Sequence, residues 1–332
     1  MTGSESAASS SNHVVVTGGL GFIGSHVVDG YLEAGARVTV IDSEIGPAVD
    51  GAEYDSHPHC EVVRKSLTEF FADGGNFAGV DLVIHAASLV GPAGILKYGG
   101  RLGTEITATA QGVVDACLEH DVPLCTFSSA EVYGRSGLLA EGDTILVTPD
   151  YNVRIEYAVA KTLTEVLTFN NRHRGLRAIA IRPFNVAGPR QSKAGGFVMP
   201  TFVQQALAGD PLTVFDTGKQ LRAFLSVMDL QRFMLQHLPA ALEGERFVYN
   251  VGSPDNRITV WDLAHRVRDF TQSESPIVMT DAKTIHGPLY EEAESFEKTP
   301  VLDAALSLGW EPQIKLDTLI QETIDYYAAQ RP

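Results

Sequence analysis

A doubly wound parallel α/β sheet of the Rossmann type, joined to a smaller C-terminal α/β lobe, is the fold that three features of the sequence predict. From His13 onward, short β-branched runs alternate with amphipathic helical stretches, which is typical of βαβ units. A glycine-rich turn follows the first run. The alternation loosens after about residue 188, where we expect the second lobe to begin. The expected division is a disordered tail at 1–12, a first domain at 13–187 with a return segment at about 227–252, and a second lobe at 188–226 and 253–332.

The composition indicates a water-soluble protein. Hydrophobic residues make up 44% of the 332 positions, which is enough for a large core. A formal net charge of −16 disfavours binding to nucleic acid or to an anionic membrane, because the mean field repels polyanions. The three cysteines form no CxxC pair and the histidines show no ligand spacing, so we expect neither a disulfide framework nor a metal. We expect a cytoplasmic location, because the first residues do not resemble a signal peptide and no apolar run is long enough to span a membrane.

The glycine-rich turn has the spacing of a dinucleotide-binding site. Its glycines lie between a first strand and a helix, at Gly18, Gly21 and Gly24. Glycines so placed permit a tight turn, close approach of the backbone to a pyrophosphate, and close helix–strand packing. The pyrophosphate would bind at the helix N-terminus. Asp42 ends the second strand, where a carboxylate accepts both ribose hydroxyls and repels a 2′-phosphate, so we expect NAD rather than NADP.

Two later strand ends carry small or polar residues at the edge where open α/β sheets bind their ligands. The fourth expected strand ends in Ala86 and Ala87, which let a flat cofactor lie against the backbone. The fifth leads into Ser129 and Glu131, a hydroxyl and a carboxylate. His85 is expected to be a packed structural histidine. Later strands are expected at 61–64, 80–85, 124–128, 176–182, 212–215 and 247–251, and helices at 104–120, 199–207, 260–270 and 316–327.

Tyr157 and Lys161 are four residues apart and would lie about one turn apart on one face of a helix. A phenol titrates near ~10 and is alone a poor base at neutral pH. An ammonium group beside it favours the phenolate and lowers its pKa, so the pair would accept and donate a proton. Tyr and Lys also occur four residues apart by coincidence, so other motifs in the chain are needed to show whether this pair is catalytic.

Together these stretches resemble the extended short-chain dehydrogenase/reductase family, in its branch of NAD-dependent nucleotide-sugar epimerases, dehydratases and decarboxylases. The match follows the same order along nearly the whole chain. The segments that carry it are Thr17–Gly24, Asp42, His85–Ala87, Ser128–Gly134, Tyr157–Lys161, Arg182–Asn185, Gly188–Arg190, Leu221–Phe224 and Leu308–Pro312.

The resemblance implies that the first domain binds NAD and that the C-terminal lobe binds a UDP-sugar substrate. Tyr157 would take the proton of a sugar hydroxyl, Lys161 would lower the pKa of Tyr157 and bind the nicotinamide ribose, and Ser129 would hydrogen-bond the sugar oxygen. NAD contacts are expected from Gly18, Gly21, Phe22, Ile23, Gly24, Asp42, Ala86, Ala87 and Lys161. Substrate contacts are expected from Ser129, Asn185, Arg190, Val198, Thr213, Arg222 and Lys298, the last replacing an arginine pair of relatives. Relatives commonly form homodimers through the helix that carries the Tyr-Lys pair, and we expect the same here.

The residues opposite Tyr157 leave the reaction open. Dehydratases of the family usually carry Asp-Glu where this chain has Ala130 and Glu131, and an alanine cannot protonate a leaving hydroxyl. Decarboxylases of UDP-glucuronate carry a glutamate matching Glu131, although their Tyr-Lys helix is often more charged. We expect NAD-dependent 4-epimerisation of a UDP-hexose or a UDP-hexuronic acid such as UDP-glucuronate, through a 4-keto intermediate. Decarboxylation of UDP-glucuronate is the first alternative, dehydration the second, and a non-catalytic NAD-binding sensor the third.

Overall fold

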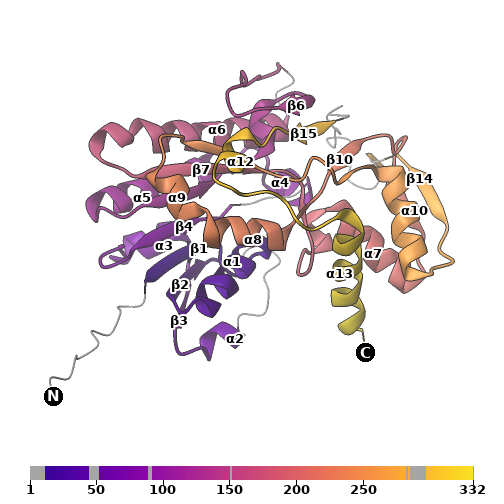
Figure 1. Ribbon diagram of the computed structural model, residues 1–332, viewed down its shortest axis with the longest axis horizontal. Helices are drawn as coiled ribbons and strands as arrows, with labels where there is room; N and C mark the ends of the chain where they lie inside the picture. Colours follow the sequence, from indigo (N-terminus) through magenta and orange to yellow (C-terminus); the bar gives the residue numbers. More distant parts are fainter. Residues whose placement is uncertain are drawn as a thin grey trace.

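A seven-stranded sheet, in which all neighbouring strands run parallel, forms the centre of the larger lobe (Figure 1). The structure, a computed structural model, describes residues 12–44, 52–88, 92–149, 152–281, 283–284 and 297–331. The strand order β12-β7-β5-β4-β1-β2-β3 confirms the predicted doubly wound parallel sheet. Its strands are β1 (His13–Thr17), β2 (Arg37–Asp42), β3 (Cys60–Arg64), β4 (Leu82–His85), β5 (Leu124–Phe127), β7 (Ala178–Pro183) and β12 (Val248–Val251).

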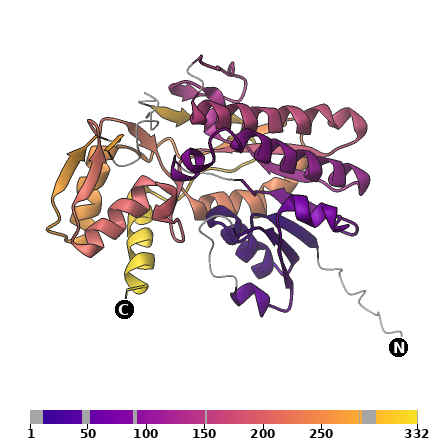
Figure 2. The ribbon, with the colours of Figure 1, turned by 180° about the vertical axis from the view of Figure 1, so that it is seen from behind.

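Alternating side chains of the strands supply two cores, one on each face of this sheet. On β1, Val14 and Val16 point into one core and Val15 into the other, as the period of two in a strand requires. The first core is covered by α1 (Phe22–Glu33), α8 (Val227–Gln236), α9 (Leu238–Glu243) and α12 (Asp303–Ser307). The opposite face is covered by α3 (Leu67–Ala72), α5 (Leu102–Glu119) and α6 (Val153–Asn170), as Figures 1 and 2 show.

Residues 302–310 belong to the first core, although the sequence analysis assigns them to the C-terminal lobe. Trp310 is fully buried and packs edge-on against Phe233 of α8, with ring centroids 5.7 Å apart. Its indole Nε1 donates a hydrogen bond to the Asp229 backbone carbonyl at 3.2 Å. Burial of the large indole, together with Leu302, fixes this short segment against the sheet. The other boundaries of the expected division stay predictions.

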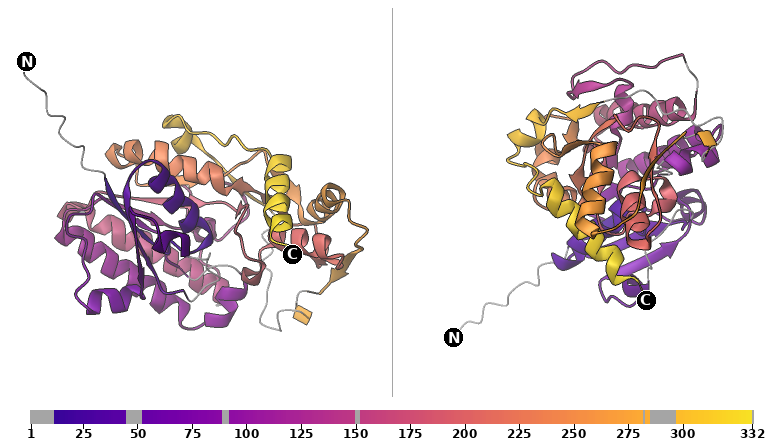
Figure 3. Two further views of the ribbon diagram at one scale, coloured as in Figure 1. Left: turned by 90° about the horizontal axis from the view of Figure 1, so that it is seen from below. Right: turned by 90° about the vertical axis from the view of Figure 1, so that its right-hand side faces the viewer.

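A second, smaller core lies at one end of the molecule, on the right in Figure 1 and apart from the sheet in Figure 3. Its apolar side chains come mainly from α7 (Val198–Ala208), α10 (Val260–Thr271), α13 (Leu316–Ala329) and β9 (Leu212–Phe215). Four two-stranded sheets join distant segments: β9 with β14 (Ile277–Thr280), β10 (Leu221–Ala223) with β13 (Arg257–Thr259), β8 (Val186–Ala187) with β11 (Leu225–Ser226), and β6 (Gly137–Leu139) with β15 (Lys298–Pro300). β10 also contacts β15, which brings Arg222 and Lys298 together.

The remaining elements are short. They are α2 (Ala52–Asp55), α4 (Pro92–Tyr98) and the 3₁₀ turns η1 (Ala130–Tyr133), η2 (Arg172–Arg174) and η3 (Lys193–Gly195). The tail expected at 1–12 lies outside the described residues except for Asn12. Within the described ranges, none of the helices has both the length and the apolar character needed to span a bilayer.

Candidate functional site

The glycine turn between β1 and α1 is packed so closely that its glycines have no room for side chains. Gly18 has a φ of +70°, and a Cβ there would lie 2.7 Å from the Ala87 backbone nitrogen. A Cβ on Gly24 would lie 2.0 Å from the Gly18 carbonyl oxygen. The Gly21 N–H donates to that same oxygen at 3.1 Å. The turn therefore places its backbone against the end of β4, where the sequence predicts the cofactor.

The start of α1 and the end of β2 fit a dinucleotide. The N-cap residue of α1 is Gly21, which has no side chain to bind the N–H groups of the first turn, at Phe22 and Ile23, so this turn suits an anion. The Asp42 carboxylate lies beside the turn, because its Oδ2 accepts from the Leu20 N–H at 3.0 Å and its Oδ1 accepts from the Glu44 N–H at 2.8 Å. A carboxylate here favours free ribose hydroxyls over a 2′-phosphate. The residues present thus fit NAD.

Tyr157 and Lys161 are both buried on α6, next to the end of β5. The Tyr157 hydroxyl hydrogen-bonds with Ser129, and the Lys161 ammonium donates to the Phe127 carbonyl at 2.9 Å. Lys161 Nζ lies 5.9 Å from the centre of the Tyr157 ring. Burial raises the pKa of Tyr157, the Ser129 hydrogen bond lowers it, and the charge of Glu131 raises it again. The net effect is a raised pKa for Tyr157, whereas the sequence analysis expects Lys161 to lower it.

Glu131 is bound by a cation from the C-terminal part of the chain. Lys298 Nζ lies 2.6 Å from Glu131 Oε1, and the two side chains are only 9% and 28% exposed. Burial alone would raise the pKa of Glu131, but the charges of Lys298, Arg154 and Arg222 lower it to about 2. Burial lowers the pKa of Lys298, and the charge of Glu131 opposes that change. Three cations thus act on a single carboxylate, two residues from Ser129.

Arg154 belongs to this cluster, although the sequence analysis does not identify it. It lies in the first turn of α6, three residues before Tyr157, so the two side chains share one helix face. α6 packs against η1, the turn that carries Glu131. The helical spacing was visible in the sequence. The sequence does not show that Glu131 lies nearby, however, and an arginine near a helix terminus is usually a solvated surface residue.

Asn185 and Arg190 hold parts of the fold in place. The Asn185 side-chain amide donates to the Ala223 carbonyl at 3.3 Å, so it fixes the strand that carries Arg222. Arg190 pairs with Asp29 of α1, with Nη1 and Oδ2 2.5 Å apart. The structure therefore brings Arg222 to the Glu131 cluster and leaves Arg190 beside α1.

Val198 and Thr213 lie in the second lobe. Val198 is the first residue of α7 and is partly buried against the second core. Thr213 on β9 is tied to Gln205 of α7 by two hydrogen bonds of 3.1 Å: its N–H donates to Gln205 Oε1, and Gln205 Nε2 donates to Thr213 Oγ1. Contact of Val198 and Thr213 with a substrate stays a prediction.

His85 has a partner that the sequence does not reveal. It is buried at the end of β4, with its ring Nδ1 2.8 Å from the Thr17 hydroxyl. Burial lowers the pKa of His85 to about 3, and the neighbouring charge of Lys161 acts in the same direction. The imidazole is therefore neutral at physiological pH and adds no charge around Lys161.

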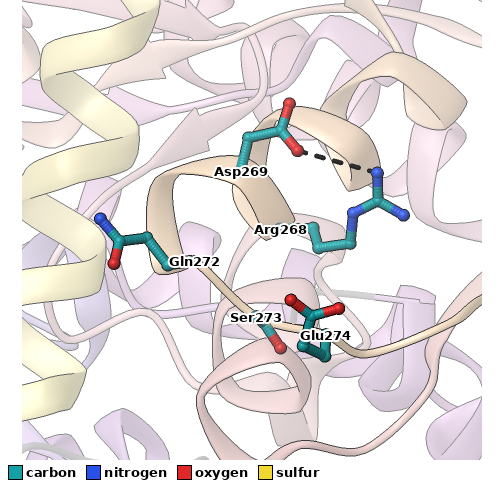
Figure 4. A pocket seen from close by; sticks show the side chains of 5 residues that line it. All are labelled: Arg268, Asp269, Gln272, Ser273 and Glu274. Atoms are coloured by element: carbon teal, nitrogen blue, oxygen red, sulfur yellow. Dashed lines mark ion pairs between the residues drawn. The ribbon is translucent and has the colours of Figure 1, made fainter.

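Neither metal ligands nor a surface hollow provides a second site among the described residues. No group of three or more His, Cys, Asp or Glu side chains among these residues is arranged to hold a metal ion. A surface hollow at the C-terminal end of α10, shown in Figure 4, is lined by Arg268, Asp269, Gln272, Ser273 and Glu274. Arg268 pairs with Asp269 at 3.7 Å across the hollow's rim, and most of the lining residues are exposed. The hollow therefore lacks the buried polar groups of a built site.

The chain is similar to known proteins over nearly its whole length. The model of the NAD dependent epimerase/dehydratase family matches residues 14–252. The UDP-N-acetyl-alpha-D-glucosaminuronate decarboxylase of Bacillus cytotoxicus is 27% identical, over 94% of this chain and 97% of that protein. The UDP-glucuronic acid decarboxylase 6 of Arabidopsis thaliana is 30% identical, over 92% of this chain and 86% of that protein.

A solved structure shows the same fold. The UDP-N-acetylglucosamine 4-epimerase of Methanobrevibacter ruminantium, in complex with UDP-N-acetylmuramic acid, superposes with a TM-score of 0.82. The superposition covers 97% of this chain and 99% of that one, at 24% sequence identity. At that identity the likeness establishes the fold and leaves the reaction to be argued from the residues of the site.

Proposed function

This chain belongs to the NAD-dependent epimerase/dehydratase family, and we propose that it decarboxylates a UDP-hexuronic acid, such as UDP-glucuronate, through a 4-keto intermediate. The sequence alone favours 4-epimerisation over decarboxylation. The geometry around Glu131 leads us to propose decarboxylation first and 4-epimerisation second. The two relatives compared above are both named as decarboxylases of UDP-sugar acids.

The proposed reaction combines a reversible oxidation with the cleavage of one carbon–carbon bond. NAD held at the glycine turn and Asp42 would supply the reversible transfer of a hydride at C4 of the sugar. Tyr157 accepts the proton of the C4 hydroxyl, and Ser129 donates a hydrogen bond to the C4 oxygen. The resulting β-keto acid loses carbon dioxide: the bond from C5 to the carboxylate breaks, and its electron pair passes to the C4 carbonyl. The enolate then takes a proton at C5, and Tyr157 returns its proton to the C4 oxygen.

The Glu131–Lys298 ion pair is the observation that carries this proposal. A 4-epimerase needs no acid or base besides Tyr157, whereas a decarboxylase has to deliver a proton to C5. Burying an ion pair costs several kcal/mol of desolvation per ion, so a buried pair at this place indicates a role other than stabilising the fold. Lys298, whose pKa is lowered by burial, is suited to releasing a proton, and Glu131 holds its ammonium group at 2.6 Å.

The charges around Glu131 also argue for an acidic sugar and against dehydration. Arg154 and Arg222 lie close enough to lower the pKa of Glu131, and guanidinium groups at this place suit the carboxylate of a hexuronic acid. With a pKa of about 2, Glu131 is too weak a base to take the C5 proton that dehydration requires.

The same cations support 4-epimerisation of a UDP-hexuronic acid as the second candidate. A substrate carboxylate held by arginine or lysine is stabilised in its charged form and so resists loss as carbon dioxide. The keto sugar would then turn over before the hydride returns to its other face. Both candidates share Tyr157, Ser129 and an acidic substrate, and they differ in the fate of the carboxylate.

Incubation with UDP-glucuronate distinguishes the two reactions. We expect mass spectrometry and NMR to show a UDP-pentose together with carbon dioxide. A product with the mass of the substrate would contradict decarboxylation and support 4-epimerisation.

The variant Glu131→Gln tests the role of the ion pair in the same assay. We expect it to lower decarboxylation at least about 100-fold, because Lys298 loses the carboxylate that holds its ammonium group. Glu119→Gln, which changes an exposed glutamate at the end of α5, is the matched control and should keep full activity. Normal turnover by Glu131→Gln would show that the pair does not take part in catalysis.

We further propose a homodimer with α6 at its interface. Val159, Leu163 and Val166 are spaced four and three residues apart and form one apolar stripe on α6, with exposures of 40%, 42% and 46%. Leu163→Glu is expected to yield monomers in sedimentation experiments, because the dimer would bury an unpaired charge. Leu306→Glu, at an exposed leucine of α12, is the control and should leave the dimer intact. A monomeric wild type would contradict the proposal.

A further inference from the structure

Lys161 is a buried cation that needs a nearby anion to stay charged. Its side chain is almost inaccessible, and one hydrogen bond, to the Phe127 carbonyl at 2.9 Å, anchors its ammonium group. The ionisable groups facing it are Tyr157 and Glu165 on its own helix and His85 on β4. His85 is neutral, and burial raises the pKa of Tyr157. Glu165 is therefore the negative charge that acts on Lys161, from one turn further along α6.

Glu165 is held in a single orientation by Arg182 of β7. The guanidinium binds the carboxylate through two parallel hydrogen bonds, Nε to Oε1 at 2.8 Å and Nη2 to Oε2 at 2.7 Å. The two side chains are only 4% and 6% exposed. Arg182 itself lies over the Tyr133 ring, 4.8 Å from its centre, and Tyr133 donates to the Asn250 side chain at 2.7 Å. The carboxylate is thus fixed by a packed network that reaches across β7 and β12.

We propose that Glu165, oriented by Arg182, is a positioning residue that keeps Lys161 charged beside Tyr157. Glu165 follows Lys161 by four residues on α6, which places the two side chains on one helix face. It touches neither substrate nor cofactor and acts only through Lys161. The inference rests on the proposed role of Tyr157 and Lys161 in proton transfer.

Two opposing effects set the pKa of Lys161, and one of them comes from a single carboxylate. Burial lowers the pKa of Lys161 to about 8, and the charge of Glu165 opposes this lowering. Without Glu165 the pKa of Lys161 would fall further, so a smaller fraction of Lys161 would be charged at physiological pH. Proton transfer that needs a charged Lys161 is lost as the pH rises through the Lys161 pKa, so removal of Glu165 should move this loss to lower pH.

Titration of Lys161 by NMR of isotope-labelled lysine side-chain nitrogens tests the inference without substrate. The Lys161 signal is assigned by its absence in Lys161→Arg. We expect Glu165→Gln to lower the Lys161 pKa by about one to two pH units, and Glu165→Asp, which keeps the charge, to change it far less. The high-pH limb of the kcat profile should move to lower pH by a similar amount in Glu165→Gln.

The double variant Glu165→Gln/Arg182→Gln guards against loss of folding, because Glu165→Gln alone leaves the Arg182 charge buried without its partner. It should also lower the Lys161 pKa, since Arg182 acts on Lys161 only through Glu165. An unchanged Lys161 titration in the folded double variant would overturn the inference, as would equal effects of Glu165→Asp and Glu165→Gln. Because this readout needs no turnover, a failure to decarboxylate UDP-glucuronate would count against the proposed function alone.

Discussion

Replacing Tyr157 by Phe is expected to lower kcat by about three orders of magnitude, since general acid–base groups contribute about 10²–10⁴-fold. The variant removes only the hydroxyl, which hydrogen-bonds with Ser129. The ring would stay packed among Leu102, Ile106 and Ala160, so the fold should not change. The glycine turn that fits NAD is built from other elements. Affinity for NAD, measured by calorimetry, should therefore equal that of the wild type.

Tyr31→Phe is the matched control for this experiment. Tyr31 is partly buried, and its hydroxyl donates a hydrogen bond to the Met234 carbonyl at 3.0 Å beside the first core. Its loss should leave kcat within a factor of about two, because the hydroxyl lies on the other face of the sheet from α6. Turnover of Tyr157→Phe at the wild-type rate would rule out Tyr157 as the proton acceptor. Absence of any turnover by the wild type, with NAD bound, would favour the non-catalytic sensor.

The parts of the fold that were predictable from sequence are those with a local cause. The alternation of Val14, Val15 and Val16 follows from the period of a strand, and the turn at Gly18 from the need for a positive φ and close packing. The shared face of Tyr157 and Lys161 follows from helical geometry alone. Each of these features is decided within a few residues, so neighbouring sequence suffices to predict it.

The parts that were not predictable depend on pairing between distant segments. The sequence analysis considers Lys298 as an anchor for the substrate, whereas its ammonium binds Glu131 because β15 pairs with β6. Arg154 gains its role from the packing of α6 against η1, the turn that carries Glu131. Arg190 is paired with Asp29 of α1, and no local sequence pattern predicts that contact. Long-range ion pairs have no sequence period, so only the folded chain reveals them.

The buried carboxylate of Asp229 is expected to make a large polar contribution to the stability of the fold. Asp229 lies in the first turn of α8 and accepts hydrogen bonds from the Gln313 N–H at 3.0 Å and the Ile314 N–H at 2.9 Å. It also pairs with Arg232 at 2.7 Å. Asp229→Ala would leave two backbone donors without their acceptor and would take the carboxylate from Arg232, which keeps its hydrogen bond to the Glu311 carbonyl at 2.6 Å. Breaking a buried pair of this kind costs about 3–5 kcal/mol of unfolding free energy.

Urea denaturation followed by circular dichroism measures this loss. Asp325→Ala, which changes an exposed carboxylate of α13 that accepts a hydrogen bond from Gln321, is the control and should stay within about 0.5 kcal/mol of the wild type. Asp229→Asn keeps one acceptor oxygen and should lie between the two. Because residues 310–314 lead from Trp310 in the first core to α13 in the second, Asp229→Ala should loosen both ends of this connection. An Asp229→Ala protein that unfolds at the wild-type urea concentration would show that the segment is held by the packing of Trp310 alone.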